Sequence, residues 1–169
     1  MILTVHGLTP DTGKTIYIAE SADIIGDVTF AEDTTVWFNA VIRGDLAPIS
    51  FGRGSNIQDN AVIHMNTGIP VTVGEFCSIA HGAIVHGCTI GNCSLIGMGA
   101  VVLDESVIGS SCLVAAGSLV PQGKKYPDGS LILGSPARAV RSLTEEEIEN
   151  IRRTARSYIE KGNTYAQMR

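Results

Sequence analysis

The sequence predicts an all-β solenoid, a parallel β-helix of six-residue repeats that ends in one α-helix. Aliphatic residues recur every six positions over about residues 12–133. The composition is 44% hydrophobic but only 5% aromatic, with 19 glycines, which suits short strands joined by tight corners. Near the C-terminus the spacing of apolar residues becomes helical, over 144–162. We therefore expect a single domain over residues 1–169.

Each repeat begins with an aliphatic residue and has a small residue at its fifth position. Three repeats, about 18 residues, are expected to close one three-sided turn, with the first residue of each repeat pointing inward. The expected inward residues are Ile25, Ala31, Trp37, Phe51, Ile57, Ile63, Val73, Ile79, Val85, Ile90, Ile96, Val102, Ile108, Val114 and Val120.

The end of the chain is predicted to be a helix that packs along the outside of the coil. Thr144 followed by Glu147 predicts a capping box at its start. Gly162 and Asn163 predict its end. The segment Gly123–Pro136, rich in glycine and proline, is expected to be a linker between coil and helix.

Charge and hydropathy exclude several classes of partner. The net charge is -5, which argues against nucleic acid and against an anionic membrane. The N-terminus has no basic leader before an apolar stretch, and no apolar run approaches the roughly 18 residues of a membrane span. We expect a cytoplasmic protein with four reduced cysteines, of which Cys77 and Cys112 occupy the small fifth position of a repeat and Cys88 and Cys93 the fourth.

Three histidines suggest a metal site. His64 and His86 each follow an inward residue and are 22 residues apart, one turn plus a four-residue insertion within Met65–Pro70. They should therefore stack on one face, about 4.8 Å apart, where two imidazoles can share an ion. His81 lies on another face, so a neighbouring chain would have to supply it. Three such contacts close a homotrimer with three metal sites.

The alternative for these histidines is a structural role, either in buried polar networks or in an exposed ladder. Two in vertical register favour metal binding instead. Asp59 lies 22 residues before His81 and should stack beneath it, as carboxylates that orient metal ligands do. Other polar residues unusual for a β-helix face lie nearby, and Arg43 with Asp45 can also form a structural ion pair. These residues are Arg43, Asp45, Asn56 and Gln58.

Three segments resemble the gamma-class carbonic anhydrase family of the hexapeptide-repeat superfamily: WFNAVIRGD (37–45), SNIQDNAVIH (55–64) and CSIAHGAIVHG (77–87). The resemblance implies a left-handed β-helix and a trimer that binds Zn²⁺, or Fe²⁺ or Co²⁺, through histidines of two subunits. It implies metal ligands at His64, His81 and His86. It also implies an intersubunit ion pair of Arg43 with Asp45, contacts of Asn56 and Gln58 with solvent or substrate, and a supporting role for Asp59.

The activity implied by the resemblance is reversible hydration of carbon dioxide to bicarbonate by metal-bound hydroxide. The sequence departs from the family prototype at Leu46, which replaces a glutamate, and in the short loop Met65–Pro70. That loop has no carboxylate, whereas the prototype has a long acidic loop with a proton-shuttling glutamate. Tyr158 resembles an aromatic residue that approaches the metal in short-loop members, and packing of the helix on the coil is its alternative role.

Two other functions remain open from the residues alone. The same scaffold supports acyl transfer or thioester hydrolysis, and a metal-dependent thioesterase would use the same ligands. A non-catalytic trimer that keeps the metal for stability is the third alternative. Measured turnover on carbon dioxide and on a thioester separates the three.

Overall fold

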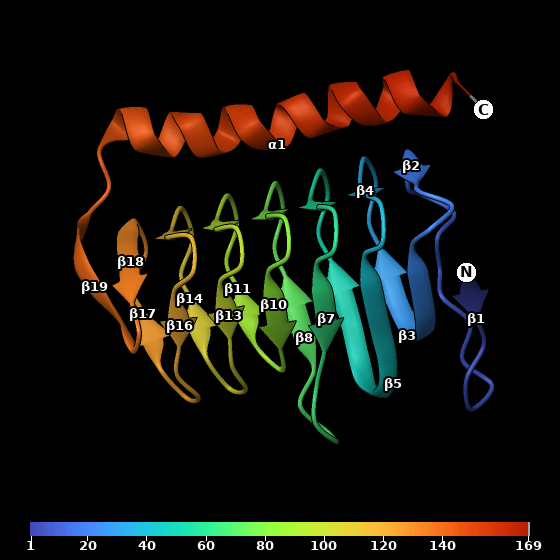
Figure 1. Ribbon diagram of the computed structural model, residues 1–169, viewed down its shortest axis with the longest axis horizontal. Coiled ribbons are helices and arrows are strands. Elements are labelled where there is room, and N and C mark those ends of the chain that lie inside the picture. Colours follow the sequence, from blue (N-terminus) through green and yellow to red (C-terminus); the bar gives the residue numbers. More distant parts are fainter. Residues whose placement is uncertain (169) are drawn as a thin grey trace.

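The computed structural model describes residues 1–168, which form a three-sided parallel coil of about seven turns with one long helix along its side (Figure 1). The coil advances from the N-terminal end to the C-terminal end, and the helix then runs back along it (Figure 1). The predicted solenoid with a C-terminal helix is confirmed.

Two sheets make up the three sides. Two sides belong to one eleven-stranded sheet, which bends at β5 because β5 pairs with β7 through its first half and with β8 through its second. Its strands are β1 (Ile2–Leu3), β3 (Asp23–Phe30), β5 (Val41–Phe51), β7 (Val62–His64), β8 (Val71–Val73), β10 (Ile84–His86), β11 (Thr89–Ile90), β13 (Val101–Val102), β14 (Val107–Ile108), β16 (Leu119–Val120) and β17 (Lys125–Tyr126). The third side is β2 (Tyr17–Ile18), β4 (Thr35–Val36), β6 (Asn56–Ile57), β9 (Ser78–Ile79), β12 (Leu95–Ile96), β15 (Leu113–Val114), β18 (Ser130–Gly134) and β19 (Ala137–Ser142).

The core consists of three columns of buried side chains, one for each side. In each column the residues of successive turns are paired Cα to Cα, so every aliphatic side chain packs on the ones above and below it. This packing explains why no single turn would be stable alone. The columns are Ile24, Ile42, Ile63, Val85, Val102 and Val120; Phe30, Phe51, Val73, Ile90, Ile108 and Tyr126; and Val36, Ile57, Ile79, Ile96, Val114 and Ile132.

The prediction for the first turn was wrong by one residue. The predicted inward residues were Ile25, Ala31 and Trp37, and the residues that point into the core of the coil are Ile24, Phe30 and Val36. Successive inward residues are normally six positions apart, but β5 rounds its corner between Ile42 and Phe51 with three extra residues. The pattern lost its phase there, and a shift of one residue turns a side chain to the other face of a strand. Trp37 consequently packs outside the coil.

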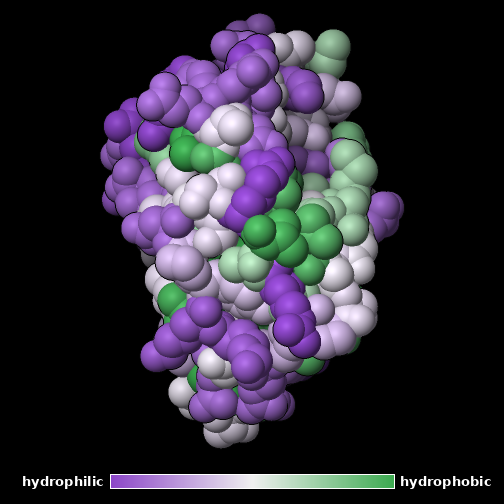
Figure 2. Space-filling view, turned by 90° about the vertical axis from the view of Figure 1, so that its left-hand side faces the viewer, coloured by the Kyte–Doolittle hydropathy of each residue, from purple (hydrophilic) through white to green (hydrophobic). Residues whose placement is uncertain are grey.

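The segment 123–136 is not a linker, as predicted, but the last part of the coil. It contains β17 and β18, and Ile132 completes the third column. The chain then reverses, and β19 pairs antiparallel with β18. Figure 2 looks onto this end of the molecule and shows a small hydrophobic patch among hydrophilic side chains.

The helix α1 (Glu145–Ala166) begins with the predicted capping box between Thr144 and Glu147. It does not end at Gly162, as predicted, but continues to Ala166. Gly162 is buried, and a Cβ at this position would lie 2.5 Å from Cγ2 of Thr35 in β4. The glycine therefore allows a close approach of helix and coil. Within residues 1–168, no helix is long and apolar enough to cross a membrane.

Candidate metal centre

The stacking of His64 on His86 is confirmed. They end the neighbouring parallel strands β7 and β10 and are Cα partners in register. Their ring centroids are 5.3 Å apart, and Nδ1 of His64 lies 3.3 Å from Nε2 of His86. The four-residue insertion between them forms a loop at Met65–Pro70, so the strands keep their register.

Each of these imidazoles also contacts a carboxylate through its other nitrogen. Nε2 of His64 lies 3.1 Å from Oδ1 of Asp45, and Nδ1 of His86 lies 2.7 Å from Oδ1 of Asp104. An ionised carboxylate can only accept, so we assign the protons to these two nitrogens. The remaining nitrogens, Nδ1 of His64 and Nε2 of His86, then carry lone pairs that face one another.

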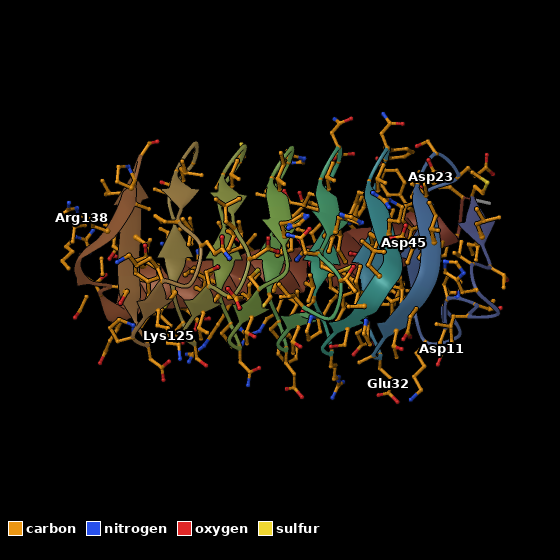
Figure 3. The ribbon with its side chains drawn as sticks, turned by 90° about the horizontal axis from the view of Figure 1, so that it is seen from below. Asp11, Asp23, Glu32, Asp45, Lys125 and Arg138 are labelled. Atoms are coloured by element: carbon orange, nitrogen blue, oxygen red, sulfur yellow. The ribbon has the colours of Figure 1, made fainter. Side chains whose placement is uncertain are left out.

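Asp45 is held by a second partner, Arg43. Nη1 of Arg43 donates to Oδ2 of Asp45 at 2.5 Å, while Oδ1 is directed at His64. Burial opposes ionisation of Asp45, but the hydrogen bonds from Arg43 and His64 outweigh it and keep the pKa of its carboxyl below its ordinary value. Figure 3, seen from the side opposite α1, shows Asp45 on β5. The ion pair closes within one chain, and its role across subunits stays a prediction.

His81 lies apart from the other two histidines, at the corner after β9 on the third side of the coil. Its Nδ1 contacts Oδ2 of Asp59 at 2.7 Å, so the predicted stacking of Asp59 beneath His81 is confirmed. Its Nε2 lies 3.4 Å from the hydroxyl of Tyr158 on α1. The ring of Tyr158 packs edge-on against Trp37, with centroids 5.3 Å apart, so this tyrosine both packs the helix and reaches His81.

Asn56 and Gln58 lie on the same side of the molecule as His81. Both are buried, and Nε2 of Gln58 donates to Oδ1 of Asn56 at 3.0 Å. Asn56 in turn donates to Oγ of Ser78 at 2.9 Å. This series of hydrogen bonds fixes the orientation of both side-chain amides. Gln58, His81 and Tyr158 line one cavity of about 480 Å³, whose other walls are mostly apolar.

The predicted site residues therefore form two half-sites in one chain. The first half-site contains Arg43, Asp45, His64 and His86, and the second contains Asn56, Gln58, Asp59, His81 and Tyr158. Within residues 1–168 of one chain, no three His, Cys, Asp or Glu side chains converge on a common ion position.

The sequence interpretation missed Asp104. This turn of the coil has only 17 residues, since Val85 pairs with Val102, so the register places Asp104 over Gly87 and not over His86. The side chain of Asp104 reaches Nδ1 of His86 from that neighbouring position. Asn66, in the insertion loop, was also missed. Its Nδ2 donates to Oδ2 of Asp104 at 2.7 Å. The count along the repeat points to Leu103 over His86, so it could not have found Asp104, and nothing in the sequence indicates which way the loop folds.

The first half-site fits a tetrahedral metal ion. With metal–nitrogen bonds of about 2.0–2.1 Å, two ligand nitrogens of such an ion lie about 3.3–3.4 Å apart. The unprotonated nitrogens of His64 and His86 are 3.3 Å apart. Two lone pairs at this separation repel unless a proton or a cation lies between them. Neutral imidazoles with carboxylate partners are a common donor set for zinc.

The four cysteines are free thiols, as expected, and three are buried. Burial raises the pKa of Cys77 and of Cys88 to about 12. Thiols with such pKa values are poor metal ligands and poor nucleophiles. The structure therefore gives Cys77 and Cys88 a packing role, and the histidines remain the candidate ligands.

Comparison with known proteins gives consistent matches. The family model described as "Bacterial transferase hexapeptide (six repeats)" matches residues 87–122. The chain is 42% identical to a carbonic anhydrase of Geobacillus kaustophilus, over 98% of this chain and 91% of that protein. A solved structure of a hexapeptide transferase family protein from Anaplasma phagocytophilum covers 98% of both chains with a TM-score of 0.93 and 38% identity.

A plant relative is longer. The chain is 39% identical to gamma carbonic anhydrase 2, mitochondrial, of Arabidopsis thaliana, over 98% of this chain and 62% of the plant protein. It thus spans less than two thirds of that relative's length. Fold and site together define a hexapeptide-repeat β-helix protein with paired, carboxylate-supported histidines. At these identities and coverages, the chain belongs to the gamma carbonic anhydrase family.

Proposed function

We propose that this protein is a metal-dependent carbonic anhydrase that hydrates carbon dioxide reversibly to bicarbonate. The observation that carries the proposal is the 3.3 Å separation of Nδ1 of His64 from Nε2 of His86, the two imidazole nitrogens that we assign as unprotonated. Family membership supports the choice of reaction, since relatives over nearly the whole chain are named carbonic anhydrases.

We propose further that the centre is completed between chains of a homotrimer. His64 and His86 supply two ligands, and His81 of the partner subunit supplies the third. The two half-sites lie on different sides of the coil, so a head-to-tail contact repeated three times closes a ring with three centres. Exposed Val62 and Ile84 lie beside the first half-site, and the apolar cavity wall lies beside His81. These surfaces would bury one another in such a ring.

Zn²⁺, Fe²⁺ or Co²⁺ bound by these imidazoles supplies Lewis-acid chemistry, which brings the pKa of water near 7 and makes hydroxide available at neutral pH. The residues of the chain orient the reactants. Gln58 points into the cavity beside His81 with its amide fixed by Asn56, so it can orient solvent or a carbon dioxide oxygen. Asp45, Asp59 and Asp104 each hold one imidazole in place.

Proton release is where this chain differs most from the prototype. The loop Met65–Pro70 contains no carboxylate, and Leu46 lies exposed where the prototype has a glutamate. The proposed reaction releases one proton for each bicarbonate formed, and external buffer must accept it. We therefore propose a turnover number that depends on buffer concentration.

The test is stopped-flow carbon dioxide hydration by protein loaded anaerobically with zinc or with iron. His81→Ala and His86→Ala should each be inactive. If the two variants are unfolded and reassembled together in equal amounts, about a quarter of all interfaces, or one in three within the mixed trimers, should carry three intact ligands and regain activity. No activity in the loaded wild-type protein would refute the enzyme, and no recovery in the mixture would refute the shared centre.

Acyl thioester chemistry is a second candidate, and the cavity of about 480 Å³ beside His81 is the observation that favours it. Its walls include Leu95, Met98 and Leu113, which could accommodate an acyl chain. The same metal-loaded protein would then hydrolyse acyl-CoA, which releases a free thiol. Thiol release without carbon dioxide hydration would establish this alternative. Full metal loading without turnover on either substrate would indicate a metal-stabilised trimer.

A further inference from the structure

We infer that Asp104 is a positioning residue of the metal centre, which fixes the tautomer and the orientation of His86 and is itself held by the loop that follows His64. This inference rests on the proposed metal centre. Asp104 is only 8% exposed, although it is an acidic residue at a corner of the coil. Burial of an isolated carboxylate is costly, so its partners must compensate.

Both carboxylate oxygens of Asp104 have a partner. Oδ1 accepts from Nδ1 of His86 and Oδ2 accepts from Nδ2 of Asn66, each at 2.7 Å. A neutral imidazole has one proton, and the carboxylate draws it to Nδ1. Nε2 is thereby left unprotonated toward His64, as a metal ligand must be. Without Asp104, a tautomer with the proton on Nε2 would compete, and that form cannot bind an ion through Nε2.

Gly87 makes room for this carboxylate. Its φ is +50°, and a Cβ there would overlap Oδ1 of Asp104 and lie 3.1 Å from Cγ2 of Ile69. Other corner glycines have the same backbone conformation with no such neighbour. Gly129, for example, has φ +70° and nothing within 4 Å of a built Cβ. The space at Gly87 is thus specific to Asp104 rather than a general need of the corners.

The loop Met65–Pro70 gains a function from this arrangement. Among the hydrogen bonds of residues 1–168, none joins the Asn66 side chain to either histidine, yet Asn66 holds the carboxylate that orients His86. Asn66 follows β7, which ends in His64, and Asp104 lies 38 residues later, in the turn above His86. The hydrogen bond between them therefore joins segments that are distant in the sequence. The loop therefore supports the ligand of the next turn rather than supplying a proton acceptor.

The first measurement is the tautomer of His86 in the metal-free full-length protein, by long-range proton–nitrogen NMR on histidine-labelled samples. The wild-type protein should have its proton on Nδ1. Asp104→Ala should shift it toward Nε2, whereas Asp104→Asn, which keeps an acceptor oxygen, should retain Nδ1. Gly87→Ala should shift the proton as Asp104→Ala does. Gly129→Ala places a side chain at a similar positive φ without a carboxylate of another turn against it, so it is the control for backbone strain and should keep the wild-type tautomer. A merely structural Asp104 would leave the tautomer unchanged.

The second measurement is zinc affinity by competition with a chromophoric chelator. Asp104→Ala should weaken the affinity by about 10–100-fold, and Asn66→Ala by less. Since Asn66 is exposed, its variant also tests the inference if Asp104→Ala fails to fold. An unchanged tautomer and an unchanged affinity in a folded variant would overturn the inference. Absence of zinc binding by the wild-type protein would instead refute the proposed metal centre.

Discussion

Gly162 of α1 lies so close to Thr35 of β4 that a Cβ on the glycine would be 2.5 Å from Cγ2 of the threonine. This contact sets how deeply the helix sinks onto the third side of the coil. In an isolated helix, alanine would be favoured over glycine by about 1 kcal/mol. Here the clash opposes that preference.

We expect Gly162→Ala to lower the free energy of unfolding by about 1–2 kcal/mol, because overpacking exceeds the gain in helix propensity. Thr35→Ser removes Cγ2 and keeps the hydroxyl that accepts from Nε1 of Trp37 at 3.0 Å. The double variant should therefore recover most of the loss. Denaturant unfolding measures all three proteins, and equal losses in the single and double variants would contradict the proposed clash.

The hydrogen bonds of the Glu147 carboxylate lead us to expect that the stability of the protein depends on pH. This carboxylate accepts two hydrogen bonds from Arg141, each 2.7 Å long, and one from the backbone of Thr144 at 2.8 Å. The bonds from Arg141, above all, lower its pKa from 4.5 to about 2. A lowered pKa stabilises the folded state above pH 4.5, and this stabilisation is lost as the pH falls from 4.5 to about 2.

Glu147→Gln should thus melt below the wild type at pH 7, and the difference in Tm should vanish toward pH 2. Thermal unfolding across this range measures it. Glu145→Gln, also in the first turn but without such hydrogen bonds among those described here, is the control. A difference in Tm that stays constant with pH would show that the charge of Glu147 is not responsible.

The thiols should differ in reactivity. Burial raises the pKa of Cys77 and Cys88 to about 12, and Cys112 is buried as well. Only Cys93, in a pocket with Phe76, is partly exposed. Titration of the native protein with a chromogenic disulfide should therefore detect one fast thiol per chain. Cys93→Ser should remove it, and a fast phase that persists would place the reactive thiol elsewhere.

Proton release can be tested in the loop Met65–Pro70. Thr67 is exposed there, so Thr67→Glu adds a carboxylate without disturbing the core. If proton transfer limits the proposed reaction, this variant should raise kcat several-fold in dilute buffer and leave it unchanged in concentrated buffer. Thr67→Gln is the uncharged control. A kcat that changes neither with the added carboxylate nor with buffer concentration would show that another step is limiting.

The repeat made most of the fold predictable, because the inward positions recur and are occupied by aliphatic residues, apart from Phe30, Phe51 and Tyr126. Register counting from Ile63 and Val85 therefore placed His64 on His86 and Asp59 beneath His81. It failed before Phe51, because the three extra residues at the β5 corner have no signature in hydropathy. It also failed at Gly162, where a residue that commonly ends helices serves a tertiary contact instead.

The polar contacts were less predictable than the columns. Asp104 is in register with Gly87 and reaches His86 from the neighbouring position, so counting does not predict that contact. The contact of Asn66 with Asp104 depends on how a loop folds, which no periodicity encodes. The distance between Tyr158 and His81 likewise depends on how α1 lies on the coil. The proposed joining of the two half-sites depends on a second chain. In the sequence, the only indication of a second chain is that His81 falls on a different face of the coil from His64 and His86.

The return of α1 along the coil has a consequence for the order of events during synthesis. Tyr165, near the end of the chain, packs against Tyr17 and Trp37 with ring centroids 5.4 and 5.1 Å away. A ribosome makes the first turns long before it makes the segment that covers them. The nascent coil must therefore carry an uncovered aromatic surface until α1 has been synthesised. A chain that stops short of α1 would keep that surface permanently exposed to chaperones and to aggregation.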